Sequence, residues 1–339
     1  MIVLINKNTE EIMIGNQWYV VYAARKLKRN RVVGIKRLGE NLVLWRNPDN
    51  SIGCVADKCC HRGASLSQGL VKDNHIQCPF HGIEYSAEGQ CILIPANGKS
   101  SSIPDSFHQK PYATQEKYGF IWIFWGDKKE VLPEIPFFEN ISPKMHYVGI
   151  ENYWKMHYTR CIENQLDVLH LPFVHRTTIG KGNSTVINGP NTLPTPNGFD
   201  VYLKNEVDTG QKPLKPAEMP PPLPGQMHLE FMFPNLWQNY LSKKLRIFIS
   251  FTPIDEENTL LFLRMYQKIV NIPLLQPLVD WIMMKYNLVI LNQDKRVVLK
   301  QLPPKSGLKM DERLLMADQP IIKYRQIRQQ LLDYLEKGI

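Results

Sequence analysis

Two short Cys/His motifs in the first third of the chain constrain its fold more than any other feature. Cys59 and His61 enclose one residue, Cys78 and His81 enclose two, and residues 62–77 separate the two motifs. Thiolates and imidazoles are common ligands of transition metals in proteins. The spacing therefore predicts two turns of the chain that meet around one metal centre.

Two kinds of centre fit these four ligands. One is a tetrahedral zinc site with two Cys and two His, and the other is a Rieske [2Fe–2S] cluster, in which the cysteines hold one iron and the histidines the other. Gly63 and Gly82 follow the histidines closely. Glycines there let the backbone turn tightly and bring N–H groups near sulfur, which tunes a reduction potential. This favours the iron–sulfur cluster.

The other cysteines have no place in this pattern. Cys60 lies inside the first motif but outside its ligand frame, so we expect it not to bind the metal. Cys54, Cys91 and Cys161 are expected to be buried as small apolar side chains. Six cysteines in 339 residues do not indicate a disulfide scaffold, which is typical of small secreted domains.

A second set of polar residues predicts a separate metal site. Asp167 and His170 follow Glu163 by four and seven residues, which places them on one face of the helix predicted over 153–169. Pro172 ends or kinks that helix, so His175 can turn back towards His170. Non-haem Fe(II) oxygenases bind iron with two histidines and one carboxylate. Asp294, an acid in an otherwise apolar predicted helix, is the candidate third ligand.

Both patterns together resemble the Rieske non-haem iron oxygenases, the terminal oxygenase alpha subunits of ring-hydroxylating systems. The family pattern C-x-H-R-G and C-P-[YF]-H-G matches from Cys59 and from Cys78, and [DE]-x3-D-x2-H-x4-H matches from Glu163. Two positions depart from the family, Cys60 and Ile83, where a Trp is usual; neither is a ligand position.

The resemblance implies a role for each site residue. The Rieske cluster would be held by Cys59, His61, Cys78 and His81. The mononuclear Fe(II) would be held by His170, His175 and Asp294. Asp167 would link His170 to a cluster histidine of a neighbouring subunit in a homotrimer, Asn164 would lie beside the iron, and Glu163 would lie in its surroundings.

The fold class expected is α+β. Residues 1–130 are predicted to form an all-β Rieske domain, with strands over 18–22, 32–36, 42–45 and 118–125. Residues 131–339 are predicted to form an α+β catalytic domain of the helix-grip type, with an antiparallel sheet wrapped on helices. Its expected strands are 227–233, 245–252 and 260–267, and its later helices are 274–301 and 321–336. The Pro- and Gly-rich segment 188–225 is predicted to be a long loop or flap.

The function that the resemblance implies is that of an oxygenase. Electrons from NAD(P)H would reach the chain through a reductase, directly or through a ferredoxin, and O2 would be used to hydroxylate or oxidatively demethylate a small organic substrate. Monooxygenase and dioxygenase both fit. Two rival functions are a Rieske-type electron-transfer protein and a zinc-stabilised binding protein, neither of which needs the second metal site.

The charge and the hydropathy of the chain limit the kinds of partner that we expect it to bind. The net charge of +9 includes a basic run, residues 25–31, which is either a solvated loop or a docking surface for an acidic electron donor. No nucleic-acid-binding module accompanies it. The most apolar stretch, residues 269–290, is interrupted by charged and amide side chains, so no membrane span is expected. Without a signal peptide pattern, the expected compartment is the cytoplasm.

Overall fold

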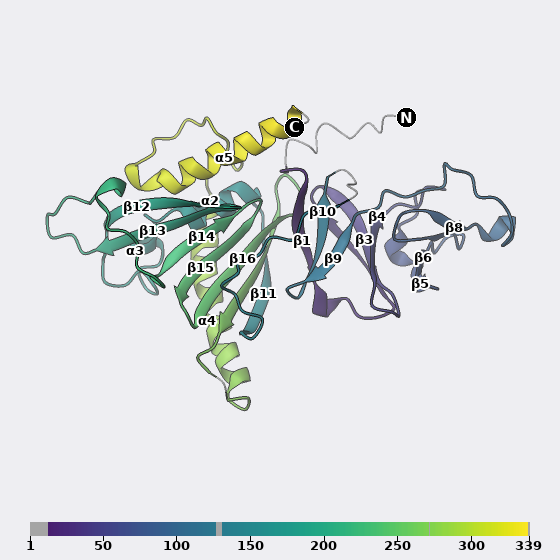
Figure 1. Ribbon diagram of the computed structural model, residues 1–339, viewed down its shortest axis with the longest axis horizontal. Coiled ribbons are helices and arrows are strands. Elements are labelled where there is room, and N and C mark those ends of the chain that lie inside the picture. Colours follow the sequence, from purple (N-terminus) through teal and green to yellow (C-terminus); the bar gives the residue numbers. More distant parts are fainter. Residues whose placement is uncertain (1–12, 127–130, 271, 338–339) are drawn as a thin grey trace. The chain divides into compact units, whose positions relative to one another are not determined.

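The chain divides into two compact units, Met1–Ile135 and Pro136–Ile339. A computed structural model describes residues 13–126, 131–270 and 272–337 (Figure 1). Each unit is described by itself below. In the described part of the chain, no helix is long and apolar enough to cross a membrane.

The first unit is built from three small antiparallel sheets. In the order of pairing they are β1 (Gln17–Ala23), β10 (Phe120–Trp125) and β9 (Thr114–Lys117); β2 (Arg31–Arg37), β3 (Glu40–Arg46) and β4 (Ile52–Ala56); and β5 (Leu70–Lys72), β6 (His75–Gln77), β7 (Glu84–Tyr85) and β8 (Cys91–Leu93). The strand predicted over 118–125 is present as β10 and is buried on both faces, because residues 120–124 are at most 3% exposed.

The turn of the β2–β3 hairpin is shorter than the gap of residues 37–41 between the predicted strands 32–36 and 42–45. Leu38 and Gly39 both have positive φ angles, as the two central residues of a tight hairpin turn require. Glu40 and Asn41, expected in the turn, instead pair with Arg37 and Lys36 as the first residues of β3.

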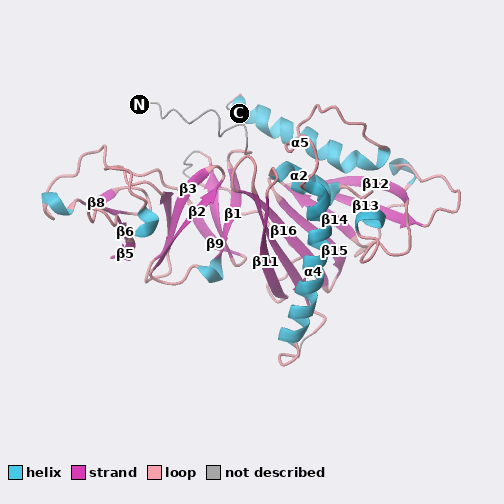
Figure 2. Cartoon of the chain, turned by 180° about the vertical axis from the view of Figure 1, so that it is seen from behind, coloured by secondary structure: helices cyan, strands magenta, loops and turns pink. Residues whose placement is uncertain are grey.

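The second unit contains a single seven-stranded antiparallel sheet with helices packed on it. In the order of pairing its strands are β11 (His146–Trp154), β17 (Thr259–Gln267), β16 (Leu245–Pro253), β15 (Leu236–Ser242), β14 (His228–Met232), β13 (Gly198–Glu206) and β12 (Val186–Thr195). The helices are α2 (Tyr158–Leu166), α3 (Leu171–Val174), α4 (Gln276–Val298) and α5 (Gln319–Glu336). Figure 2 shows α4 lying across one face of the sheet, and this arrangement confirms the predicted α+β class.

Two predicted segments were wrong. The helix expected over 153–169 begins only at Tyr158, because Tyr153 and Trp154 continue β11 and pair with β17. The side chain of His157 then accepts a hydrogen bond from the Thr159 N–H and caps α2.

The segment 188–225 was expected to be a loop, but β12 and β13 take up its first half. These strands form a hairpin at the edge of the sheet. Proline, which cannot donate to a strand ladder, is tolerated on such an edge strand, so Pro190 and Pro194 do not prevent it. The rest of the segment lies within residues 207–227, which connect β13 to β14 and contain no strand.

Candidate metal centres

The Cys/His motifs of the first unit form two tight loops of the same design. In one, the Cys59 N–H donates to Ala64 O (2.8 Å) and the Gly63 N–H donates back to Cys59 O (2.8 Å). In the other, the Cys78 N–H donates to Ile83 O (2.7 Å) and the Gly82 N–H donates to Cys78 O (3.1 Å). Both glycines have φ angles above +70°, which a residue with a Cβ rarely adopts.

The four candidate ligands separate into a buried pair and an exposed pair. Cys59 and Cys78 are each 2% exposed and belong to the core of this unit. His61 and His81 are exposed, with ring centroids 4.7 Å apart. Two thiols below and two imidazoles at the surface fit a cluster with one sulfur-ligated and one nitrogen-ligated iron.

Tyr85 adds a contact to the thiols that the sequence did not assign. Its hydroxyl lies 3.1 Å from Cys59 Sγ and 3.2 Å from Cys60 Sγ, and the ring is fully buried. A hydrogen bond to a ligating sulfur stabilises the more negative, reduced state of a cluster. Tyr85 is therefore placed to tune a cluster held by Cys59.

In the second unit, Asp167 shapes the turn between α2 and α3. Its N–H donates to Glu163 O as α2 ends, and its Oδ1 accepts from the N–H groups of Leu169 (2.8 Å) and His170 (3.2 Å). This Asx-type turn fixes the start of α3. His170 and His175 flank that short helix, and their ring centroids lie 5.1 Å apart.

Asp294 of α4 reaches the same place. Its Oδ1 lies 3.4 Å from His170 Nε2 and 3.0 Å from His175 Nε2, and one ligand atom from each residue lies within 4.8 Å of the others. The side chains are 15%, 2% and 5% exposed for His170, His175 and Asp294. The structure thus brings together three residues that are far apart in the sequence.

The Nδ1 atoms of His170 and His175 form hydrogen bonds that orient the two rings. His170 Nδ1 lies 2.6 Å from the backbone O of Asp167, and His175 Nδ1 lies 2.8 Å from Gln293 Oε1. Both partners are acceptors, so each Nδ1 carries a hydrogen, and in the neutral imidazole Nε2 is then the nitrogen that can bind a metal. Asp294 Oδ1 is buried and accepts no hydrogen bond from any residue that the structure describes.

Three potential ligand atoms therefore converge: the Nε2 atoms of His170 and His175, and Asp294 Oδ1. A cation bound by all three would satisfy the buried carboxylate oxygen. Two imidazole nitrogens and one carboxylate oxygen form the ligand set of non-haem Fe(II) sites, which leaves further positions open. The residues present fit a mononuclear iron.

Gln293 is a site residue that sequence reasoning missed. Its Oε1 accepts from both His175 Nδ1 and Thr178 Oγ1 (2.8 Å each), and its Nε2 donates to Thr177 Oγ1 (3.1 Å). Gln293 directly precedes Asp294 in α4, so one helix provides both a candidate ligand and the group that orients another. The only signal in the sequence was that adjacency.

Within the chain, Asp167 contacts His170 Nδ1 through its backbone. The contact to His170 Nδ1 comes from the Asp167 backbone carbonyl, whereas the Asp167 carboxylate Oδ1 is 3.9 Å away and already accepts two N–H groups. Burial acts to raise the pKa of Asp167, but His170 and these donors outweigh it and lower the pKa below its usual value. The carboxylate is therefore ionised at neutral pH.

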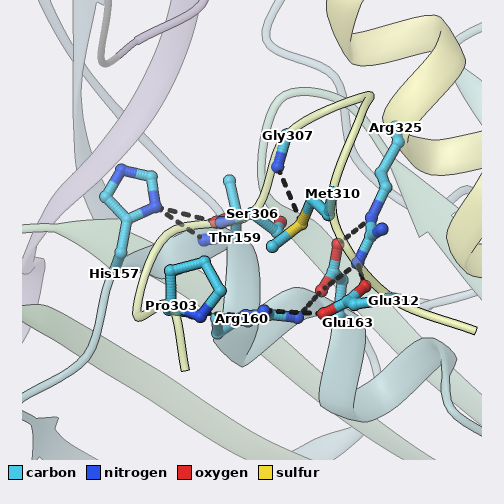
Figure 3. A network of polar contacts seen from close by, with 10 residues as sticks. All are labelled: His157, Thr159, Arg160, Glu163, Pro303, Ser306, Gly307, Met310, Glu312 and Arg325. Atoms are coloured by element: carbon cyan, nitrogen blue, oxygen red, sulfur yellow. Dashed lines mark hydrogen bonds and ion pairs between the residues drawn. The ribbon is translucent and has the colours of Figure 1, made fainter. Parts of the chain in front are cut away.

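Glu163 belongs to a buried ion-pair network (Figure 3). It accepts from Arg160 Nη1 (3.0 Å) and from Arg325 Nε and Nη2 (2.6 and 3.1 Å), and Glu312 bridges the same two arginines. The network joins α2 to α5 and to the segment before α5. Asn164, its neighbour in sequence, is 7% exposed, and its Nδ2 has no partner among the described residues.

A second group of one histidine and two carboxylates lies on the sheet: Asp200, His228 and Glu230. His228 Nδ1 donates to Gln226 O (2.7 Å), and its Nε2 lies 3.1 Å from Glu230 Oε1. Glu230 Oε1 also accepts from the amides of Asn140 (2.8 Å) and Gln238 (2.7 Å). Glu230 Oε1 therefore accepts hydrogen bonds from described residues, whereas Asp294 Oδ1 accepts none from them.

Comparison with known families agrees with both centres. The Rieske [2Fe-2S] domain family matches residues 17–111, and the vanillate O-demethylase oxygenase C-terminal domain family matches residues 154–334, over half of the chain. The chain is a Rieske non-haem iron oxygenase. Members of this family carry a Rieske cluster and a mononuclear iron, so these are its two cofactors. The zinc alternative for the Cys/His motifs is thereby excluded.

Individual relatives of this oxygenase differ in how much of their length they share with it. Methylxanthine N1-demethylase NdmA of Pseudomonas putida is 27% identical over 346 residues, covering 98% of this chain and 93% of NdmA. The chloroplastic protein TIC 55 of Pisum sativum is 28% identical over 202 residues, which cover 58% of this chain but only 36% of TIC 55. A solved structure of NdmA superposes with a TM-score of 0.79 at 24% identity over 97% of this chain and 94% of NdmA, which shows a shared fold.

Proposed function

We propose that this chain is the terminal oxygenase of a multicomponent system that hydroxylates or oxidatively demethylates a small organic substrate. Electrons from NAD(P)H would arrive through a reductase, with or without a ferredoxin. The observation that carries the proposal is the convergence of His170 Nε2, His175 Nε2 and Asp294 Oδ1, a buried oxygen that accepts no hydrogen bond from the described residues. An electron carrier has no use for such a site.

Each residue of the site has a definite task in this proposal. When bound, the Rieske cluster supplies single electrons and the Fe(II) supplies O2 chemistry next to the substrate. His170, His175 and Asp294 would hold that iron, and the Asp167 carbonyl and Gln293 would keep both Nε2 lone pairs directed at it. The buried amide nitrogen of Asn164, which has no partner among the described residues, is available to donate to substrate or water.

The apolar face of the sheet would form the floor of the substrate site. Trp237, Leu263 and Met265 lie on the same face, and Met265 contacts Asn287 of α4, the helix that carries Asp294. All three side chains are at most 4% exposed. A floor of this kind excludes water from the iron and favours an apolar substrate.

The assembly and the cell compartment are also part of the proposal. Residues 1–130 would be the Rieske domain and 131–339 the catalytic domain. Cluster ligands His61 and His81 are exposed, so an electron can leave through them to another group. In the proposed homotrimer that group is the iron site of the neighbouring subunit, linked through Asp167. We place the enzyme in the cytoplasm, where a reductase has access to NAD(P)H.

Metal analysis and oxygen uptake test the proposal. The purified holoenzyme should be red-brown and should contain one mononuclear iron beyond the two that match its acid-labile sulfide. With a reductase it should consume O2 in the presence of methoxy-aromatic or N-methyl compounds and release formaldehyde. A protein that holds only cluster iron and shuttles electrons without substrate turnover would be a carrier, and the proposal would be wrong.

A further inference from the structure

The N-terminal half of α4 and the segment before it expose an unusual number of large apolar side chains. Leu274 is 89% exposed, Trp281 60% and Leu278 57%. We call the whole group the α4 tip: Ile269, Ile272, Leu274, Leu275, Leu278, Trp281, Ile282, Tyr286 and Val289, all at least 46% exposed. Single exposed apolar residues are ordinary, but a contiguous patch marks a surface that contacts something else.

The helix carries two separate faces. Its inner face buries Met284, Asn287, Leu291, Asp294 and Val298, at alternating steps of three and four residues. The outer stripe runs from Leu275 through Ile282 to Val289 at the same helical spacing. Beyond Val289 the outer face becomes polar, with Asn292 and Arg296 exposed. The apolar stripe is therefore confined to one half of the helix.

That half projects from the unit. Figures 1 and 2 show the N-terminal end of α4 extending past the ends of the neighbouring strands. It is nevertheless anchored: His146 Nε2 of β11 lies 2.7 Å from Asp280 Oδ2, and Gln267 Oε1 accepts from the N–H groups of Ile269 and Val270. The apolar stripe is thus fixed in place as part of the surface of the folded unit.

Several lysines lie next to the α4 tip in the sequence or in the structure. Lys268 directly precedes Ile269, and its N–H donates to the backbone O of Lys244, in the exposed β15–β16 turn. Lys285 Nζ lies 6.0 Å from the centroid of the Trp281 ring. The basic rim consists of Lys144, Lys243, Lys244, Lys268 and Lys285, none of which forms an ion pair within the part of the chain that the structure describes.

One acidic side chain, Asp280, lies on the same half of the helix. It is 17% exposed, and its Oδ2 lies 2.7 Å from His146 Nε2. The α4 tip presents leucine, isoleucine, tryptophan and tyrosine next to lysines such as Lys268 and Lys285. Leucine and tryptophan beside lysine is the composition of helices that lie in a membrane interface, whereas protein–protein interfaces are depleted in lysine.

We propose that the α4 tip docks the protein on the surface of an anionic lipid bilayer. The apolar stripe enters the boundary between headgroups and acyl chains, and the lysine rim binds the negative headgroups. This role is independent of the oxygenase reaction. Because α4 also carries Asp294, the same helix would connect the bilayer contact to the candidate iron site.

Vesicle flotation tests the proposal on the full-length holoenzyme. We compare vesicles of phosphatidylcholine alone with vesicles that also contain phosphatidylglycerol, at low and at high ionic strength. The wild type is expected to float with the anionic vesicles, and binding should weaken with salt. The variant L274S/L278S/W281S should lose roughly a hundredfold in partition coefficient, since three partly exposed apolar side chains no longer enter the lipid.

A matched control removes three exposed apolar side chains elsewhere in the same unit. Leu223, Leu315 and Ile179 are 72%, 62% and 48% exposed and lie outside the α4 tip, so the variant L223S/L315S/I179S should bind vesicles like the wild type. The variant K243E/K244E should bind neutral vesicles unchanged and anionic ones less. Visible absorbance and thermal unfolding show that each variant is folded.

Three results would overturn the proposal. They are failure of the wild type to float, equal loss in the control variant, and equal binding to neutral and anionic vesicles. If the wild type does not float, analytical ultracentrifugation of the wild type and of L274S/L278S/W281S tests whether the α4 tip binds another copy of this chain. A smaller assembly for the variant alone would mean that the α4 tip joins copies of this chain.

Discussion

Two clusters in the second unit contain the same kinds of side chain but differ in their hydrogen bonds. His170, His175 and Asp294 form one, and Asp200, His228 and Glu230 form the other. In the first, buried Asp294 Oδ1 accepts no hydrogen bond from the described residues. In the second, Glu230 Oε1 accepts from Asn140 and Gln238 and also contacts His228.

The difference shows that residue types and distances alone do not define a metal site. In both clusters the histidine Nδ1 faces an acceptor, which directs Nε2 at a carboxylate. At His228 a proton satisfies both partners, because burial, which lowers its pKa, is outweighed by Glu230, the Gln226 carbonyl and Asp200, and the pKa is raised. Burial lowers the pKa of His170, but Asp167 and Asp294 outweigh it and raise this pKa as well. The clusters differ because two imidazoles face one oxygen of Asp294, and a metal ion would satisfy all three.

The largest expected effect separates the two clusters directly. Replacing Asp294 by alanine removes one of three candidate ligands, so substrate-dependent O2 uptake should fall below about 1% of the wild type. Replacing Asp200 by alanine should leave uptake within about twofold, since that cluster has no part in the proposed reaction. Equal losses in both variants would remove the distinction between the clusters.

Glu163 is a third buried carboxylate in this unit, and both of its oxygens accept hydrogen bonds from arginines. Glu163→Gln removes one of the two anions that the buried Arg160 and Arg325 share and leaves only Glu312, so the free energy of unfolding should fall by about 3–5 kcal/mol. Denaturant unfolding measures this. Arg313→Gln is the control, because the Arg313–Asp311 pair is almost fully exposed, and it should leave the unfolding midpoint unchanged. A stable Glu163→Gln variant would contradict the role of the network.

Gln293 tests whether the orientation of a histidine matters to the first cluster. Gln293→Leu removes the acceptor for His175 Nδ1, and Fe(II) affinity should fall about 10–100-fold. Gln293→Glu keeps an acceptor at the same place and should retain most of the affinity. Titration of iron-depleted protein under anaerobic conditions gives both values. If leucine and glutamate behave alike, Gln293 does not orient the ring.

The smallest expected effect concerns pH and the second cluster. Burial and the nearby Glu230 raise the pKa of Asp200 from 3.8 to about 6, opposed by His228. The folded state therefore holds that proton more tightly than the unfolded state, and its stabilising effect is lost as the pH rises from about 4 to 6. After allowance for solvent screening, Asp200→Asn should raise the free energy of unfolding at pH 7 by roughly 1 kcal/mol. No gain at pH 7, or the same gain at pH 4, would contradict this.

How much the sequence could predict depends on how local each signal is. The Cys/His motifs and the Asp167–His175 segment are short, so their spacing alone made them visible. Asp294 stood out because an acid in an apolar helix needs a partner. Gln293 did not, since an amide next to it is unremarkable until α3 packs against α4.

The second cluster and two strands were hidden for a different reason. Asp200 and Glu230 lie opposite each other only through the β13–β14 register, which no local pattern specifies. The strands β12 and β13 were mistaken for a loop because prolines break most strands, and the sequence does not show that β12 is an edge strand. The bend that turns β11 into α2 was missed for a similar reason, as Trp154 pairs with the distant Thr259.

The most direct test of the central claim is the iron content of the wild type and of Asp294→Ala, each measured against acid-labile sulfide. The account predicts that the variant keeps its sulfide, its red-brown colour and its cluster iron, and loses only the additional mononuclear iron. If the variant retains that iron, or if the wild type never contains it, then His170, His175 and Asp294 do not form the iron site.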